Sequence, residues 1–158
     1  MAQVGVYDPC WSERILDEVA RNLIANRVAT APKAAAMLDA MRGAFDAAGV
    51  DTREIARLEP KMTNDPKDRH VLAAAAASQA EMLVTLNLRD FPLAACQPHS
   101  IEAIHPDRFL LDLYQLDPEA IHAALARQAA ALSNPPMSIA DVLDRLTLTV
   151  PRFAEALQ

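Results

Sequence analysis

The segment from residue 65 to residue 91 constrains the fold most, because it places helix and strand signals in immediate succession. Asp65-Pro66-Lys67-Asp68 offers an N-cap, a proline at the first helical position and an acid in the first turn, which predict a helix beginning at Asp65. The alanine run that follows carries this helix to about Ala80. Residues 82–86 are short and apolar, as in a buried strand, and residues 87–92 are expected to form a loop. A helix followed directly by a buried strand indicates an α/β core.

The rest of the chain is predicted to be mostly helical. Ser12 is expected to cap a first helix, and a second helix is expected from Pro32 to Ala48, where Gly49 closes it. Residues 55–58 fit either a strand or a turn of helix, and a second strand is expected at residues 101–104. Further helices are expected at residues 106–114, 118–132, 138–146 and 151–157. We therefore expect an α/β core over residues 1–105 and a helical C-terminal extension of the same domain over residues 106–158.

Composition supports a helix-rich chain and excludes several classes of protein. Alanine supplies 32 of the 158 residues and glycine only three, which favours helices over a β-sandwich or barrel. The net charge of −6 argues against a broad basic surface for duplex DNA. The two cysteines lie far apart, without the spacing of a zinc site. Because we find neither a signal peptide nor a membrane span, we expect a cytoplasmic protein without a membrane partner.

The sequence contains no P-loop and none of the motifs GxGxxG, HExxH and GxSxG. The remaining candidates for catalytic residues are three acids on separate elements. Glu18 borders the apolar stripe of the first helix, Asp68 stands at the start of the alanine-rich helix, and Asp90 follows the apolar strand. Carboxylates from separate elements hold magnesium or manganese, and such an ion activates water for phosphodiester cleavage. Each acid can instead be a cap or a surface charge, which is the interpretation we favour for Asp65. His70 is expected to be a half-buried structural residue.

Three segments, in this order, resemble the PIN-domain family, in its branch of bacterial VapC-type toxin ribonucleases. They are residues 11–19 (WSERILDEV), residues 65–75 (DPKDRHVLAAA) and residues 83–91 (LVTLNLRDF). Residues 105–113 (HPDRFLLDL) and 134–137 (NPPM) resemble the C-terminal extension of one PIN subgroup. The resemblance covers nearly the whole chain. It implies an α/β fold in which a parallel sheet is flanked by helices on both sides, followed by a helix-rich extension.

The same resemblance implies an activity, a cofactor and partners. It implies an endoribonuclease that depends on Mg²⁺ or Mn²⁺, cleaves single-stranded RNA and forms the toxin half of a toxin–antitoxin pair. Glu18, Asp68 and Asp90 would be the catalytic residues and the metal ligands. The residues expected to support the site are Asn87 as an orienting amide, Asp65, and Arg69 as a partner for RNA phosphate. The implied partners are RNA and a small antitoxin protein that inserts into the site, and a homodimer is left open.

One departure from the family pattern concerns the start of the sequence. PIN domains open with an apolar strand that ends in an aspartate, whereas this sequence begins near the end of the helix that follows. We therefore expect the family's first strand and first metal aspartate to be missing. In an alternative alignment residues 4–7 are that strand and Asp8 is the acid, but Gly5 weakens the strand and Asp8 lies too close to Trp11 to leave room for the helix. The rival function is a catalytically inactive remnant that acts as a protein-binding module.

Overall fold

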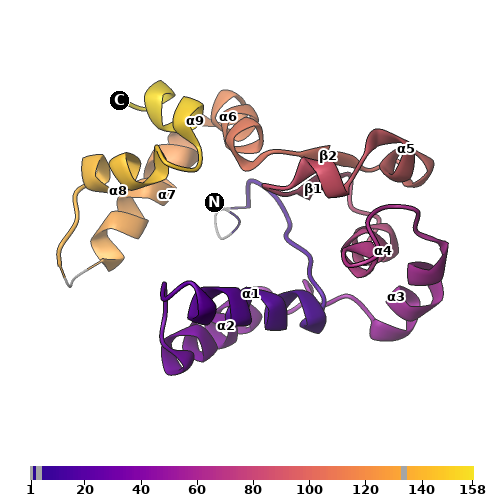
Figure 1. The fold of residues 1–158 in the computed structure, drawn as a ribbon. Helices are drawn as coiled ribbons and strands as arrows, with labels where there is room; N and C mark the ends of the chain where they lie inside the picture. The colour runs from indigo at the N-terminus through magenta and orange to yellow at the C-terminus, as the bar shows by residue number, and fades with distance from the viewer. Residues whose placement is uncertain (1, 3–4, 133–134) are drawn as a thin grey trace. The chain divides into compact units, whose positions relative to one another are not determined.

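The computed structural model describes residue 2, residues 5–132 and residues 135–158 (Figure 1). The chain divides into two compact units. The first, here called the core unit, comprises residues 8–83 and 89–103. The second, here called the helical unit, comprises residues 1–7, 84–88 and 104–158. Each unit has an apolar core of its own, so each is described separately.

The helices of the core unit follow one another with short connections. In chain order they are α1 (Glu13–Ala25), α2 (Ala31–Ala44), α3 (Thr52–Leu58), the 3-10 turn η2 (Glu59–Lys61), α4 (Arg69–Ala77), α5 (Leu93–Cys96) and the 3-10 turn η4 (Gln97–His99). The remaining elements are strand β1 (Met82–Val84), the 3-10 turn η3 (Leu88–Asp90) and strand β2 (Glu102–Ile104). Each of them contains residues of both units. The alternative left open for residues 55–58 is therefore settled as a helix, which Asp51 caps by accepting a hydrogen bond from the Arg53 N–H at 2.8 Å.

Strands β1 and β2 pair in a two-stranded sheet. The Glu102 N–H donates to the Glu81 carbonyl and the Thr85 N–H donates to the Ile104 carbonyl, both at 2.9 Å. Because the partners advance in the same direction along both strands, the sheet is parallel, and its crossover runs through α5. The helix-rich α/β class with a parallel sheet is thus confirmed. Both predicted strands are present at three residues each.

Helix α1 begins where the sequence predicts. The Ser12 hydroxyl accepts a hydrogen bond from the Ile15 N–H at 3.2 Å, which satisfies one of the free donors of the first turn. Trp11, just before this cap, is buried and packs edge-on against Phe45. The Trp11 N–H also donates to the Ala48 carbonyl at 2.9 Å. The start of α1 is therefore fastened to the segment that follows α2, and α1 and α2 lie side by side (Figure 1).

The predicted boundaries of α2 and α4 are wrong, among them the end of α4, which lies at Ala77 and not at about Ala80. Helix α2 ends at Ala44 rather than Ala48, because Phe45 leaves the helical region with φ −140° and ψ 71°. Gly49 does not close this helix but forms an isolated parallel bridge with Trp11. The long-range pairing of Gly49 thus replaces the local cap that its sequence position suggests.

Helix α4 begins at Arg69 rather than Asp65. The Asp65 carboxylate accepts a hydrogen bond from the Lys67 N–H at 3.0 Å, and the Asp65 carbonyl accepts one from the Asp68 N–H at 3.0 Å. These two bonds close a turn over residues 65–68, which is a known alternative use of aspartate followed by proline. Asp68 therefore occupies the N-cap position of α4 instead of lying inside the helix.

Helix α4 lies at the centre of the core unit. His70, Leu72 and the alanines that follow are buried, and the small alanine side chains let α3 pack closely against this helix. The surrounding apolar side chains include Met62, Leu83 and Phe91. Burial on several sides fixes the first turn of α4, which carries Asp68, relative to its neighbours.

The helical unit contains the four C-terminal helices that the sequence predicts. They are α6 (Pro106–Leu116), α7 (Pro118–Ala131), α8 (Ile139–Leu146) and α9 (Pro151–Ala156). Their core is centred on Phe153, Ile121 and Leu125, which are almost completely buried. Among the helices in the described parts of the chain, none is both long and apolar enough to cross a membrane.

Candidate functional site

Asp68 and Asp90 lie next to each other in the core unit. Asp68 is the N-cap of α4, and Asp90 is the last residue of η3, in the loop after β1. Their side chains share a hydrogen bond. The Asp65 N–H also donates to the Asp90 carbonyl, at 3.3 Å, so the backbone of the two loops is joined as well. The turn before α4 and the end of η3 therefore meet.

The pair of Asp68 and Asp90 contains two acidic groups and no basic one. The pKa of the Asp68 carboxyl is raised above its ordinary value, first because the group is partly removed from water and then because it faces Asp90. The negative charge of Asp65 acts in the same direction, whereas His70 acts in the opposite one. Two facing carboxylates repel each other. A divalent cation between them relieves this repulsion, and carboxylate oxygens are ligands of hard ions, so these two residues fit a magnesium or manganese ion.

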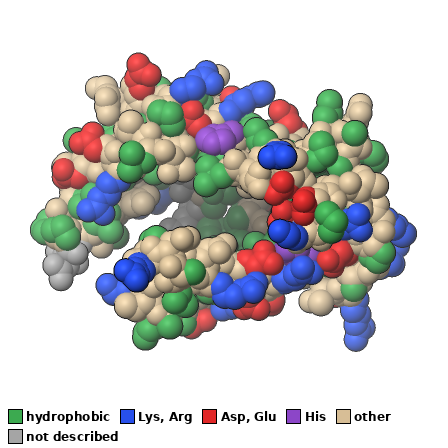
Figure 2. Space-filling view, in the orientation of Figure 1, with side chains coloured by type: hydrophobic (Ala, Val, Ile, Leu, Met, Phe, Trp, Pro, Cys, Tyr) green, Lys and Arg blue, Asp and Glu red, His purple; other side chains and the backbone are tan. Residues whose placement is uncertain are grey.

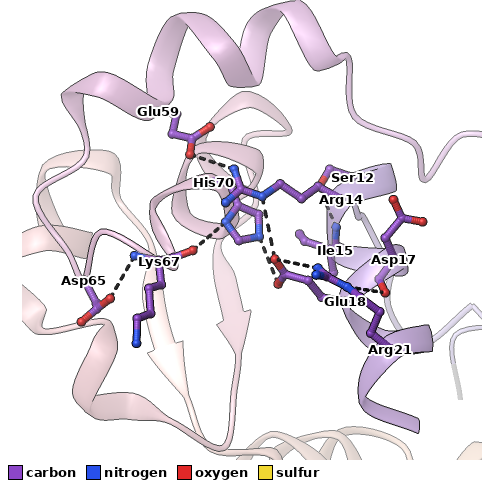
Figure 3. Close-up of polar contacts among 10 residues, drawn as sticks. All are labelled: Ser12, Arg14, Ile15, Asp17, Glu18, Arg21, Glu59, Asp65, Lys67 and His70. Carbon is purple, nitrogen blue, oxygen red and sulfur yellow. Dashed lines mark hydrogen bonds and ion pairs between the residues drawn. The ribbon is translucent and has the colours of Figure 1, made fainter. Parts of the chain in front are cut away.

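Glu18 does not join this pair in the structure. Its carboxylate lies among three basic side chains, as Figure 3 shows: 3.8 Å from Arg14 Nε, 3.7 Å from Arg21 Nη2 and 3.3 Å from His70 Nε2. Arg14 is itself held by Glu59 at 3.0 Å. The Glu18 side chain is 34% exposed, so its carboxylate remains in reach of solvent.

The structure thus brings together two of the three expected metal ligands. Within residues 2, 5–132 and 135–158, no group of three His, Cys, Asp or Glu side chains is arranged to hold a metal ion. Asp68 and Asp90 form a pair, while Glu18 on α1 contacts the first turn of α4 through His70. The role of Glu18 as a ligand, and the three-acid site as a whole, remain predictions.

The supporting residues differ in what they contact. Asp65 closes the turn over residues 65–68 and adds negative charge beside Asp68. Arg69 donates from Nε to the Asn64 carbonyl at 3.4 Å, which braces the same turn. Asn87 belongs to the helical unit, where its N–H donates to the Thr85 hydroxyl at 3.1 Å. Its role as an orienting amide stays a prediction.

The sequence analysis underestimated the burial and the contacts of one residue near this site, His70. It was expected to be half-buried, but its side chain is only 1% exposed and reaches both Lys67 and Glu18. The available signal was its position in the first turn of the helix that Asp68 caps. At that position the imidazole ring reaches the turn over residues 65–68 and not the middle of α4.

On the face drawn in Figure 2, cations and acids lie interspersed over the described residues of the core unit. Lys67 and Arg89 are exposed on the loops that carry Asp68 and Asp90. On the face drawn in Figure 2, Lys and Arg side chains lie interspersed with Asp and Glu side chains over α1 and α2. Arg42, for example, pairs with both Glu13 and Asp39. Some basic side chains of the core unit are therefore partly neutralised by neighbouring acids, as Arg42 is.

Comparison with known proteins gives two family matches and one curated relative. The family model described as "PIN domain" matches residues 1–89, and the model described as "VapC50 C-terminal domain" matches residues 106–158. A protein of Mycobacterium tuberculosis (strain ATCC 25618 / H37Rv) named "Putative ribonuclease VapC50" is 47% identical over 93 residues. The match covers 59% of this chain and 55% of the relative, so the chain spans about half the length of that relative. No solved structure matches.

Proposed function

Because this chain belongs to the PIN-domain family, we propose that it is a metal-dependent ribonuclease that cleaves single-stranded RNA. The observation that carries this proposal is the pairing of Asp68, at the start of α4, with Asp90, in the loop that follows β1. Loops that follow the carboxyl ends of parallel strands are where α/β folds bind their ligands. The pKa of Asp68 is raised first by partial burial and then by the neighbouring Asp90 and Asp65, and perturbed pKa values are common at catalytic sites.

The proposed mechanism assigns a role to each group of residues. Asp68 and Asp90 hold Mg²⁺ or Mn²⁺, with Glu18 as a further ligand. When bound, the ion makes a coordinated water more acidic and stabilises negative charge on the phosphate. Asp65 strengthens the negative potential that attracts the ion, and its hydrogen bond to Lys67 keeps the loop in shape. Arg69, Lys67 and Arg89 pair with phosphate groups of the RNA strand and orient the scissile bond.

We also propose a biological role for this chain, which is based on the name of its relative. The match in Mycobacterium tuberculosis is named as a ribonuclease of the VapC type, and the aligned region spans only about half of it. We therefore propose that this chain is the toxin half of a toxin–antitoxin pair and that a small antitoxin protein binds it. Its cytoplasmic location and a homodimer stay predictions.

One observation favours the rival function of an inactive binding module. Glu18 pairs with Arg14, Arg21 and His70 and does not lie in a cluster with Asp68 and Asp90. A chain that had lost its activity would keep such ion pairs and would have no need of a complete ligand set. Assays for cleavage and metal binding separate the two functions.

The direct test is cleavage of a pool of random-sequence single-stranded RNA with Mn²⁺ or with EDTA. We expect cleavage that EDTA abolishes and that Asp68→Asn reduces by more than the roughly 10–100-fold typical of losing an outer-shell partner. Asp17→Asn is the matched control, because Asp17 is exposed on α1 and outside the acid pair. Equal rates in the wild type and Asp68→Asn, or cleavage that survives EDTA, would exclude the proposed mechanism. No cleavage by the wild type would favour the binding module.

A further inference from the structure

A pocket lies in the core unit at the end of the helix pair α1 and α2, where the chain passes from one helix to the other (Figure 1). We call it the α1–α2 pocket. Its volume is about 290 Å³, and it is lined by Ile24, Arg27, Val28, Ala29, Thr30 and Lys33. Sites for cofactors and similar molecules usually enclose about 300–1,000 Å³. The α1–α2 pocket is therefore better suited to a few side chains of a partner.

The backbone of the connection fixes the residues on the pocket wall. The Val28 and Ala29 N–H groups both donate to the Leu23 carbonyl, at 2.9 and 3.1 Å, and close the end of α1. Arg27 lies between these bonds and the helix, in the left-handed region with φ 57°. Glycine is the usual residue at this position of a helix end. The arginine is therefore not explained by the backbone, whereas its charge lines the pocket.

The apolar part of the pocket is open to water. Ile24 is 42% exposed and Val28 is 72% exposed. An apolar residue that follows a helix end of this kind commonly packs against the last turn of the helix, but most of the Val28 side chain stays uncovered here. Single exposed apolar residues are ordinary. Two of them in the wall of one pocket offer apolar surface whose burial would stabilise a complex.

The charged part of the pocket is basic. Arg27 and Lys33 are exposed, and neither has an acidic partner among the residues that the structure describes. Other arginines of the same two helices are paired, since Arg21 contacts Glu18 and Arg42 contacts two acids. The described lining contains no acid, although the whole chain has 21 acidic and 15 basic residues. The pocket is thus complementary in charge to an acidic ligand.

We propose that the α1–α2 pocket docks an acidic peptide segment of a partner protein, in which a Leu, Ile or Val lies close to Asp or Glu. The apolar side chain covers Ile24 and Val28. The carboxylates pair with Arg27 and Lys33. Single-stranded RNA fits less well, because proteins bind its bases on aromatic side chains and no aromatic residue lines the pocket in the described structure. The inference does not depend on metal binding or RNA cleavage.

The test is a selection of short random peptides displayed on phage against the immobilised full chain. We expect enriched peptides to combine acidic and aliphatic residues. The dissociation constant of the most enriched peptide is then measured by fluorescence anisotropy. Arg27→Asn combined with Lys33→Gln should weaken its binding about 3–10-fold, because two exposed ion pairs are lost. Val28→Thr should also weaken it, because the pocket would then bury a hydroxyl group.

The variants are chosen to keep the fold. Asparagine tolerates the left-handed backbone of Arg27, and threonine has the shape of valine, so urea unfolding should be close to that of the wild type. Arg53→Gln is the matched control, because Arg53 is an exposed cation on α3, outside the pocket. It should leave the peptide affinity unchanged. Enriched peptides without acidic residues, or equal affinities for the wild type and the pocket variants, would overturn the proposal.

A parallel measurement distinguishes the peptide from RNA. Binding of short single-stranded RNA of random sequence is measured in EDTA with the same variants, and we expect Arg27→Asn with Lys33→Gln to change it no more than Arg53→Gln does. A specific loss of RNA affinity without a loss of peptide affinity would overturn the proposal. Peptide binding by a wild type that binds no Mn²⁺ would support this inference and overturn only the proposed metal site.

Discussion

The side chains of Asp68 and Asp90 share a hydrogen bond, although α4 and β1 separate these residues along the chain. Without a cation, uncharged side chains at these two positions would make the folded protein more stable than two carboxylates do. Folded proteins tolerate such repulsion at functional sites and make up for it elsewhere. Here the compensation comes from the packing of α4, whose buried alanines and Leu72 fix the first turn. The pair is therefore the basis of the account of metal binding.

Replacing Asp68 should stabilise the metal-free protein at neutral pH. The folded-state pKa of Asp68 is raised above its ordinary value of 3.8, so the folded protein holds this proton more strongly than the unfolded chain does. The associated stability is fully present below the ordinary value and is lost as the pH rises through the folded pKa. Asp68→Asn avoids that loss, and its amide can still donate to Asp90. We expect a higher free energy of urea unfolding for Asp68→Asn than for the wild type at pH 7.

The pH dependence of that difference is its control. The advantage of Asp68→Asn should shrink as the pH falls from 7 through the raised pKa of Asp68 and should be lost below its ordinary value of 3.8. Asp17→Asn should show no such trend, because Asp17 is exposed and lies outside the acid pair. A wild type that is more stable than Asp68→Asn at pH 7 without metal would contradict the described electrostatics.

Glu18→Gln tests whether the third acid belongs to the metal site. Saturating Mn²⁺ at about 100 times the dissociation constant should raise the stability of the wild type by about 2.7 kcal/mol. Because the substitution removes one anionic ligand, we expect a much smaller gain for Glu18→Gln at the same Mn²⁺ concentration. Thermal unfolding with and without Mn²⁺ measures this difference. If Glu18→Gln gains as much as the wild type, Glu18 only pairs with its basic neighbours.

The fold was predicted best where local chemistry decides it. The caps Ser12 and Ser138 satisfy backbone donors within their own turns, and both helices begin where the sequence indicates. The boundary predicted at Gly49 was wrong because this residue pairs with Trp11, which is distant in sequence. The start predicted at Asp65 was wrong because the side chain closes a turn, a choice that competes with helix capping using the same atoms.

The contact between Asp68 and Asp90 was predictable to the same extent, whereas the role of these residues as metal ligands stays a prediction. A helix start and a strand end are local features, so Asp68 and Asp90 could be found from the sequence, and the structure brings them together. The surroundings of Glu18 depend on how α1 packs against α4, which is a long-range property. The contact between His70 and Glu18 could therefore not be predicted from the sequence, although the position of His70 in the first turn of α4 was a signal for its burial.

The helical unit depends on a cap supplied from another helix. Asp107 on α6 is buried, and its Oδ1 accepts a hydrogen bond from the Phe153 N–H in the first turn of α9 at 2.9 Å. The N-cap residue of α9, Val150, has no side chain that could do this. We expect Asp107→Ala to lower the free energy of unfolding by about 1–3 kcal/mol.

Asp107→Asn is the matched variant, because its amide oxygen can accept the same hydrogen bond. Urea unfolding should therefore show a smaller loss for Asp107→Asn than for Asp107→Ala. Equal losses in both variants would mean that the charge of Asp107, and not its hydrogen bond to α9, stabilises the unit.

A calorimetric titration of the metal-free protein with Mn²⁺ shows whether Asp68 and Asp90 bind a metal ion. It compares the wild type with Asp68→Asn and with the control Asp17→Asn. The account predicts saturable binding to the wild type and to Asp17→Asn, and its loss in Asp68→Asn. Absence of binding to the wild type, or binding to Asp68→Asn with unchanged affinity, would contradict a metal site at Asp68 and Asp90.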